Sequence, residues 1–160
     1  MADDQDSMPW ERDESEEELR LGFDEEVLEA EIEYRCRDGK ALDEDEYDLE
    51  ERTARFGEDV IELAREMPQD SVTRPLIKQF VKSGTSTGAN YAEADDAESK
   101  RDFRHKIALS RKESRETMFW LRMIAKAVPD LQRDCRDLWH EADELNRIFS
   151  AIWRKTKVEE

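Results

Sequence analysis

The sequence predicts an all-α protein, namely an antiparallel up-down-up-down four-helix bundle with an acidic N-terminal extension. Four successive stretches between residues 49 and 155 place apolar side chains at steps of three and four, the period of an amphipathic helix. The connections between these stretches are short, so consecutive helices should be antiparallel neighbours. No stretch shows the sustained alternation of β-branched residues that is typical of a strand.

The first predicted helix runs from about Leu49 to Met67 and ends before Pro68. The second begins near Thr73 and accepts Pro75 in its first turn, where the helix needs no backbone N–H. The apolar residues expected on their inner faces are Phe56, Val60, Leu63 and Met67 in the first helix, and Leu76, Ile77, Phe80 and Val81 in the second.

The third predicted helix starts near Ser99, a good N-cap residue, and has Asp102 in its first turn. It stops at Pro129, and the fourth helix spans about Asp130 to Lys155. The third helix is expected to bury Phe103, Ile107, Ser110, Ser114, Thr117 and Leu121, and the fourth has Leu131, Cys135, Leu138, Ala142, Leu145, Phe149 and Ile152 in phase.

The stretch SGTSTGANYAEA, residues 83–94, is unusual for a helix because its first six positions hold two glycines and four hydroxyl residues. Gly84, Gly88 and Ala92 are four residues apart and share one face, at a cost of roughly 1 kcal/mol of helix propensity per glycine. This spacing predicts the close approach of a neighbouring backbone, with a ligand-binding site as the alternative. The polar side chains of the stretch, which must bond to nearby carbonyls or find other partners if buried, are Ser83, Thr85, Ser86, Thr87, Asn90 and Glu93.

Charge divides the chain into two parts. Residues 1–50 hold 22 acidic and 5 basic side chains, so the whole net charge of −17 belongs to them. We therefore expect an acidic arm at residues 1–46, largely disordered, with a short helix at 16–36, followed by the bundle at 47–157. Neither a signal sequence nor a membrane span is recognised, and Cys36 and Cys135 show no metal-binding spacing, so a cytoplasmic protein with reduced thiols is expected. The apolar stripe of the short helix consists of Leu19, Phe23, Val27, Ala30 and Tyr34.

The segment SGTSTGANYAEA, followed by SKRDFRHKIALSRKESRET and WLRMI, resembles the four-helix-bundle proteins related to the 23S rRNA intervening-sequence protein, also called S23-like. YDLEERTARFGEDVIEL and RPLIKQFVKSGTS resemble the same family, so the similarity covers residues 47–129 closely and the last helix loosely. The resemblance implies a bundle that assembles into a ring-like homopentamer without known catalytic activity. A related protein is the accessory variability protein of diversity-generating retroelements, which binds reverse transcriptase and nucleic acid.

The third predicted helix carries five arginines on one flank, a stripe about five turns long that can follow a line of phosphates. Two alternatives stay open, because the stripe either binds nucleic acid or is neutralised by glutamates of adjacent helices. The acidic arm has the opposite charge and is expected to compete with external polyanions for the stripe. The arginine row consists of Arg101, Arg104, Arg111, Arg115 and Arg122.

The opposite flank of the same helix carries Leu109, Trp120 and Met123, which are surplus to a single bundle core. A contiguous apolar patch of this kind predicts a subunit interface, to which Trp139 and Trp153 of the last helix can contribute.

A two-metal site is the enzymatic alternative, because Asp102-x-x-His105 and Asp137-x-x-His140 imitate the carboxylate and histidine pairs of metal-binding bundles. Helical phase turns both histidines far from the core direction, so no metal site is expected. No nucleophile has a base at a suggestive spacing either. The further ligands of such a site would be Glu62 and Glu93.

These observations lead to two functional hypotheses for a non-enzymatic, oligomeric scaffold without cofactors. It is either a nucleic-acid or nucleoprotein accessory factor, with RNA, DNA or a reverse transcriptase-type nucleoprotein as its partner, or a protein-binding module whose acidic arm recruits a basic partner. Neither a small-molecule substrate nor a membrane is expected.

Overall fold

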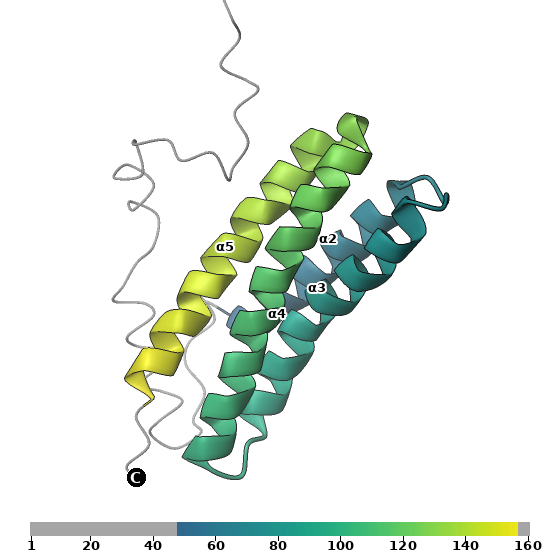
Figure 1. The fold of residues 1–160 in the computed structure, drawn as a ribbon. Helices are drawn as coiled ribbons and strands as arrows, with labels where there is room; N and C mark the ends of the chain where they lie inside the picture. The colour runs from purple at the N-terminus through teal and green to yellow at the C-terminus, as the bar shows by residue number, and fades with distance from the viewer. Residues whose placement is uncertain (1–47, 157–160) are drawn as a thin grey trace, which may run out of the picture. The chain divides into compact units, whose positions relative to one another are not determined.

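The structure of the protein is a computed structural model, in which residues 48–156 are described. Four helices follow one another as an antiparallel bundle: α2 (Leu49–Glu66), α3 (Thr73–Asp95), α4 (Lys100–Ala127) and α5 (Gln132–Lys155). A single 3₁₀ turn, η2 (Pro129–Leu131), joins α4 to α5, and α5 returns to the side of α2 (Figure 1). The predicted all-α four-helix bundle is confirmed. The predicted arm at 1–46 and its helix at 16–36 lie outside the described residues.

Side-chain caps account for the starts of two helices. Asp48 accepts a hydrogen bond of 3.0 Å from the Glu51 N–H at the start of α2. The expected cap of α4 is confirmed, because the Ser99 hydroxyl accepts a bond of 3.1 Å from the Asp102 N–H. Before α3, Asp70 accepts backbone bonds from Thr73 and Val72, and these bonds lower the pKa of its carboxyl.

The core follows most of the predicted apolar faces, with several corrections. Three residues expected on the inner face of α3 are only half-buried: Leu76 lies in the first turn of the helix, and Ile77 and Val81 lie at the edge of its buried face. Phe103 and Leu131 are only half-buried, because Phe103 lies in the first turn of α4 and Leu131 in the 3₁₀ turn before α5. These positions are at the ends of the bundle, where fewer helices surround a side chain. Conversely, Ile148 is fully buried although it was not among the expected core residues of α5. Burial raises the pKa of the Cys135 thiol to about 12, so the group is a buried neutral thiol.

The contact between α2 and α3 is very close at two glycines. A Cβ placed on Gly84 would lie 2.6 Å from a Val60 methyl carbon, and one on Gly88 would lie 3.0 Å from the backbone oxygen of Thr53. Only a residue without a side chain fits at either position while α2 stays where it is. Ala92 on the same face is half-buried.

Hydroxyl groups fill the contact between α3 and α4. Thr117 donates to the Ser83 hydroxyl at 3.0 Å, and both side chains are buried. Thr85 and Thr87 bond to carbonyls one turn back, at Val81 and Ser83, as helical Ser and Thr residues do when the surroundings are apolar. The remaining polar residues of the stretch are half-buried Ser86, half-buried Asn90, whose amide donates to the Ser86 carbonyl at 2.8 Å, and exposed Glu93.

Candidate nucleic-acid interface

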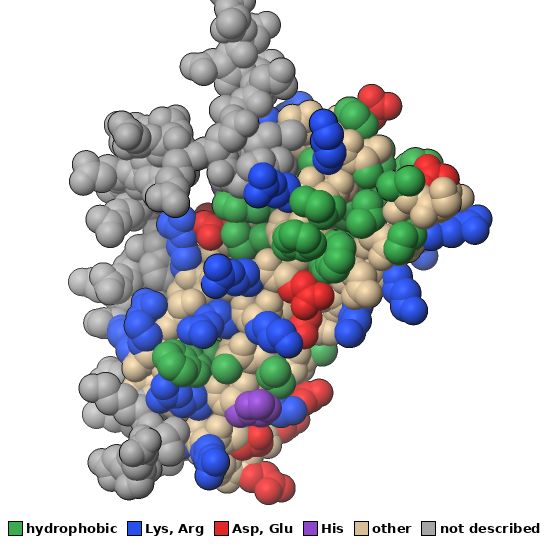
Figure 2. All heavy atoms as spheres, in the orientation of Figure 1, with side chains coloured by type: hydrophobic (Ala, Val, Ile, Leu, Met, Phe, Trp, Pro, Cys, Tyr) green, Lys and Arg blue, Asp and Glu red, His purple; other side chains and the backbone are tan. Residues whose placement is uncertain are grey.

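The arginine row lies along the flank of α4 that faces α5. Arg104, Arg111, Arg115 and Arg122 are spaced by seven, four and seven residues, which keeps them on one side of a helix. Arg101, Arg115 and Arg122 are exposed, whereas Arg104 and Arg111 are half-buried against α5. Figure 2 shows Lys and Arg side chains gathered over this part of the surface, along α4 and α5.

Two residues of the row lie on an aromatic side chain of the last helical turn of α5. The guanidinium carbon of Arg104 is 4.0 Å from the ring centroid of Trp153, and that of Arg111 is 4.9 Å away. Arg104 also donates a hydrogen bond of 2.7 Å to the carbonyl oxygen of Thr156, just after α5. These contacts are cation–π interactions supported by a helix C-terminal carbonyl, where a positive charge is favourable.

Neutralisation by neighbouring glutamates does not account for four residues of the row. Within residues 48–156, no carboxylate forms an ion pair with Arg101, Arg104, Arg111 or Arg115. On the opposite flank, by contrast, Lys106 is paired with Glu93 of α3, and this hydrogen bond raises the pKa of the lysine. The flank towards α5 therefore carries positive charge that no carboxylate of the described residues neutralises.

The three expected interface residues, Leu109, Trp120 and Met123, are all half-buried on the flank of α4 towards α3. The Trp120 indole N–H donates to Glu116 at 3.2 Å, and its ring meets Phe119 edge-on at a centroid distance of 5.0 Å. Phe119 is 53% exposed and was not among the expected residues, because it points almost directly away from the core. Figure 2 shows the resulting apolar patch over the end of α4 that is upper in the view.

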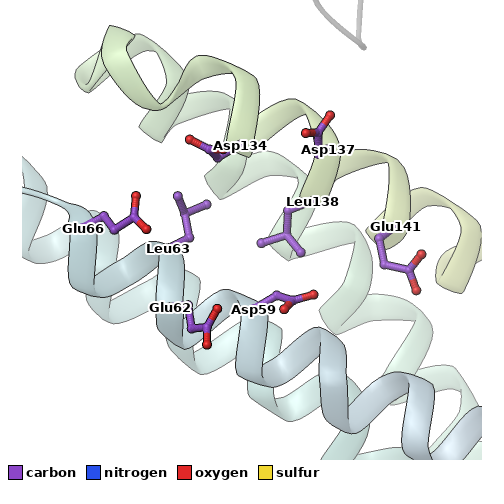
Figure 3. Close-up of a pocket in the computed structure, with 8 residues that line it drawn as sticks. All are labelled: Asp59, Glu62, Leu63, Glu66, Asp134, Asp137, Leu138 and Glu141. Carbon is purple, nitrogen blue, oxygen red and sulfur yellow. The ribbon is translucent and has the colours of Figure 1, made fainter.

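A second surface feature is an acidic groove of about 400 Å³ between α2 and α5. Figure 3 shows Leu63 and Leu138 pointing towards one another between the helices, whereas the carboxylate of Asp137 points away from α2. Burial, with repulsion from Glu62, Glu141 and Glu58, raises the pKa of Asp59. The groove is lined by Asp59, Glu62, Leu63, Glu66, Asp134, Asp137, Leu138 and Glu141.

Arg52 of α2 joins the two helices by hydrogen bonds to two glutamates of α5. Its Nε atom donates to Glu141 at 2.6 Å and its Nη2 atom to the other oxygen of the same carboxylate at 2.8 Å. Nη2 also donates to Glu144. A two-point pair of this kind is the strong form of an arginine–carboxylate contact.

The residues weighed for a metal site do not come together. His105 and His140 are both exposed. Among residues 48–156, no group of three or more His, Cys, Asp or Glu side chains is placed to hold a metal ion, although six carboxylates line the groove. In the same part of the chain, none of the helices has the length and apolar character that crossing a bilayer requires.

Sequence reasoning found the arginine row and the apolar flank but missed three features of this surface. It did not place Trp153 under Arg104 and Arg111, it omitted Phe119, and it did not identify the acidic groove. The first and third features combine residues of two helices, so they depend on how the helices are rotated against each other. Phe119 had a usable signal, since an aromatic residue opposite the core is surplus to the fold.

Comparison with known proteins relates this bundle to a family model and to solved structures. The family model described as 23S rRNA-intervening sequence protein matches residues 45–151. A solved structure from Bacteroides thetaiotaomicron, a protein of unknown function from the S23 ribosomal protein family, is 25% identical with a TM-score of 0.60. The alignment covers 67% of this chain and 99% of that one. No curated protein matches the chain.

Proposed function

The chain belongs to the 23S rRNA-intervening sequence protein family. We propose that this protein is a non-enzymatic helical scaffold that binds nucleic acid through the arginine row. The observation that carries the proposal is that four of these arginines have no carboxylate partner within residues 48–156. Unpaired guanidinium groups in a line along one helix are suited to contact phosphates, because each contact releases condensed counterions.

The direct test is to measure binding of the full chain to RNA and DNA oligonucleotides at several salt concentrations. Arg101 and Arg115 are the best positions to change, since both are exposed and neither forms an ion pair with a carboxylate within residues 48–156. Replacing both by Gln should weaken binding and reduce the slope of log K against log salt by about 0.7 to 0.9 for each arginine lost.

Arg65→Gln is the matched control, because Arg65 is an exposed arginine on α2 that has no carboxylate partner in the described part of the chain. This variant should bind as the wild type does. Salt-independent binding, or equal losses in the control and the double variant, would contradict the proposal.

The scaffold is proposed to be a homo-oligomer, with the apolar patch around Trp120 as its interface. Phe119 at 53% exposure beside half-buried Trp120 and Met123 supports this, since single soluble chains rarely expose such clusters. Light scattering after gel filtration should give a multiple of the chain mass of 18.9 kDa, five times that mass for a pentamer. Trp120→Glu should release single chains, and a wild-type mass near 18.9 kDa would contradict the assembly.

A second candidate function is protein binding through the acidic arm. It is favoured by the concentration of the entire net charge of −17 in residues 1–50. Binding of a lysine-rich peptide by the full chain, together with no retention of RNA or DNA, would favour this candidate over the first.

A further inference from the structure

Trp153 draws two members of the arginine row together. Arg104 and Arg111 are separated by about two helical turns, or roughly 10 Å along the axis of α4. Their guanidinium carbons lie 4.0 Å and 4.9 Å from the same ring centroid, so these carbons are at most 8.9 Å apart, the sum of the two distances. One indole of α5 therefore contacts two cationic groups of α4, which are closer to each other than their positions along the helix axis.

Both arginines keep hydrogen-bonding capacity for a ligand. A guanidinium group has five N–H donors, of which Arg104 uses one for the Thr156 carbonyl. Neither Arg104 nor Arg111 forms an ion pair with a carboxylate within residues 48–156. The two groups are thus held in place by an aromatic face and a carbonyl, contacts that do not neutralise their charge.

We propose that Arg104, Trp153 and Arg111 form a pre-ordered clamp for neighbouring phosphates of one nucleic-acid strand. The inference rests on the proposed function and specifies its central contact and ligand. Arg104 and Arg111 contact the phosphates, and Trp153 is a positioning residue that fixes the two arginines before the ligand arrives. Binding then costs less side-chain entropy than it does for two free arginines.

The ligand assigned to the clamp is a single strand. A half-exposed indole within a line of positive charges is the combination that single-stranded nucleic acids use, because the charges follow the backbone and the aromatic group lies where unpaired bases pass. The two guanidinium carbons are at most 8.9 Å apart, a range that includes the spacing of successive phosphates on the same strand. The exposed residues Arg101 and Arg115 extend the line of positive charge in both directions from the clamp.

The experiment measures affinity and salt dependence separately, with the full chain and one fluorescent oligonucleotide in single-stranded and duplex form. Arg104→Gln and Arg111→Gln should each weaken single-strand binding and lower the salt slope by about 0.7. Trp153→Leu should weaken binding by about two- to fivefold, the value of an exposed cation–π contact, with the salt slope unchanged because no charge is lost.

Two variants keep the test independent of folding. Trp153→Phe retains an aromatic face and should bind nearly as the wild type does, whereas Trp139→Leu removes another half-buried tryptophan of α5 and should not change affinity. Wild-type affinity of Trp153→Leu, equal losses in Trp139→Leu, or tighter binding of the duplex than of the single strand would overturn the clamp. If the wild type shows salt-dependent binding that Arg104→Gln and Arg111→Gln leave unchanged, the clamp is wrong while the proposed function stands. No salt-dependent binding by the wild type would reject both.

Discussion

Helix α2 has two neighbours in the bundle, and it packs against them in opposite ways. Against α3, the absence of side chains at Gly84 and Gly88 lets α2 come so close that the Val60 side chain and the Thr53 backbone occupy the space of the missing Cβ atoms. Against α5, carboxylates line an open groove and the packing is the least extensive of the four neighbouring helix pairs. One contact is therefore determined by shape and the other by charge, so changes to the two should differ in size and in their response to salt and pH.

The largest expected effect is at Gly88, on the close contact. Gly88→Leu places a branched side chain where a Cβ alone would already lie 3.0 Å from the Thr53 carbonyl oxygen. That oxygen belongs to the backbone of α2 and cannot turn away, so the helices must separate. Thermal or denaturant unfolding should show a loss of about 1 to 3 kcal/mol or more. Unchanged stability would mean that α2 does not lie this close to α3.

Alanine substitutions at the glycines sharpen the same point, because helix propensity alone predicts a gain of up to about 1 kcal/mol at each. Gly84→Ala should instead destabilise, since its Cβ would lie 2.6 Å from a buried Val60 methyl carbon. Gly57→Ala is the matched control, because its nearest neighbour would be the Thr85 Cα at an ordinary 3.8 Å. The control should be neutral or more stable than the wild type. A gain at both positions would show that propensity, not packing, decides.

Substitutions in the charged contact between α2 and α5 should lower the free energy of unfolding less than those at the glycines, and the loss should depend on salt. Arg52→Met removes the two-point pair with Glu141 and the bond to Glu144, at an expected cost of about 1 kcal/mol in dilute buffer. Because the groups are partly exposed, the cost should shrink at high salt.

Arg55→Met is the control for this change. Arg55 is paired with Glu51 one turn away, and both side chains are exposed, so the expected loss is no more than about 0.5 kcal/mol. Equal losses for Arg52→Met and Arg55→Met would contradict a special role of Arg52 in joining α2 to α5.

The two contacts also differ in how far the sequence predicts them. The glycine spacing at 84 and 88 belongs to a single helix, so the need for a close neighbour is visible from the sequence. The identity of that neighbour, Val60 and Thr53 of α2, depends on helix order and rotation. The acidic groove combines carboxylates of two helices that are far apart in sequence, and each one alone looks like an ordinary solvated residue.

The same difference between patterns within one helix and contacts between two helices holds for the candidate nucleic-acid interface. The arginine row was predictable because its members repeat along α4 with the helical period. Trp153 was noticed only as a surplus aromatic residue, because its contacts with Arg104 and Arg111 arise from the pairing of α4 with α5. Features within one helix could thus be predicted from the sequence. Features that combine two helices could not, because they depend on the rotation and register of the helices.

The smallest expected effect concerns the pH response of the groove. Burial and the neighbouring carboxylates raise the pKa of Asp59 in the folded protein above its unfolded value, so the folded state binds this proton more tightly. The charged form of Asp59 therefore lowers the free energy of unfolding above the folded pKa, and protonation restores it as the pH falls through that range.

Asp59→Asn should be more stable than the wild type at pH 7 by a few tenths of a kcal/mol, because the group is largely exposed. The gain should disappear at acidic pH. It should shrink in high salt, because salt screens the repulsion from the neighbouring carboxylates but not the cost of burial. Other groups also change stability with pH, and Asp70, whose pKa is lowered, does so in the opposite direction. Subtracting the wild-type stability from that of the variant at each pH leaves the contribution of Asp59 alone. Glu98→Gln, outside the groove, should bring no such gain, and a pH-independent effect of Asp59→Asn would refute electrostatic repulsion across the contact between α2 and α5.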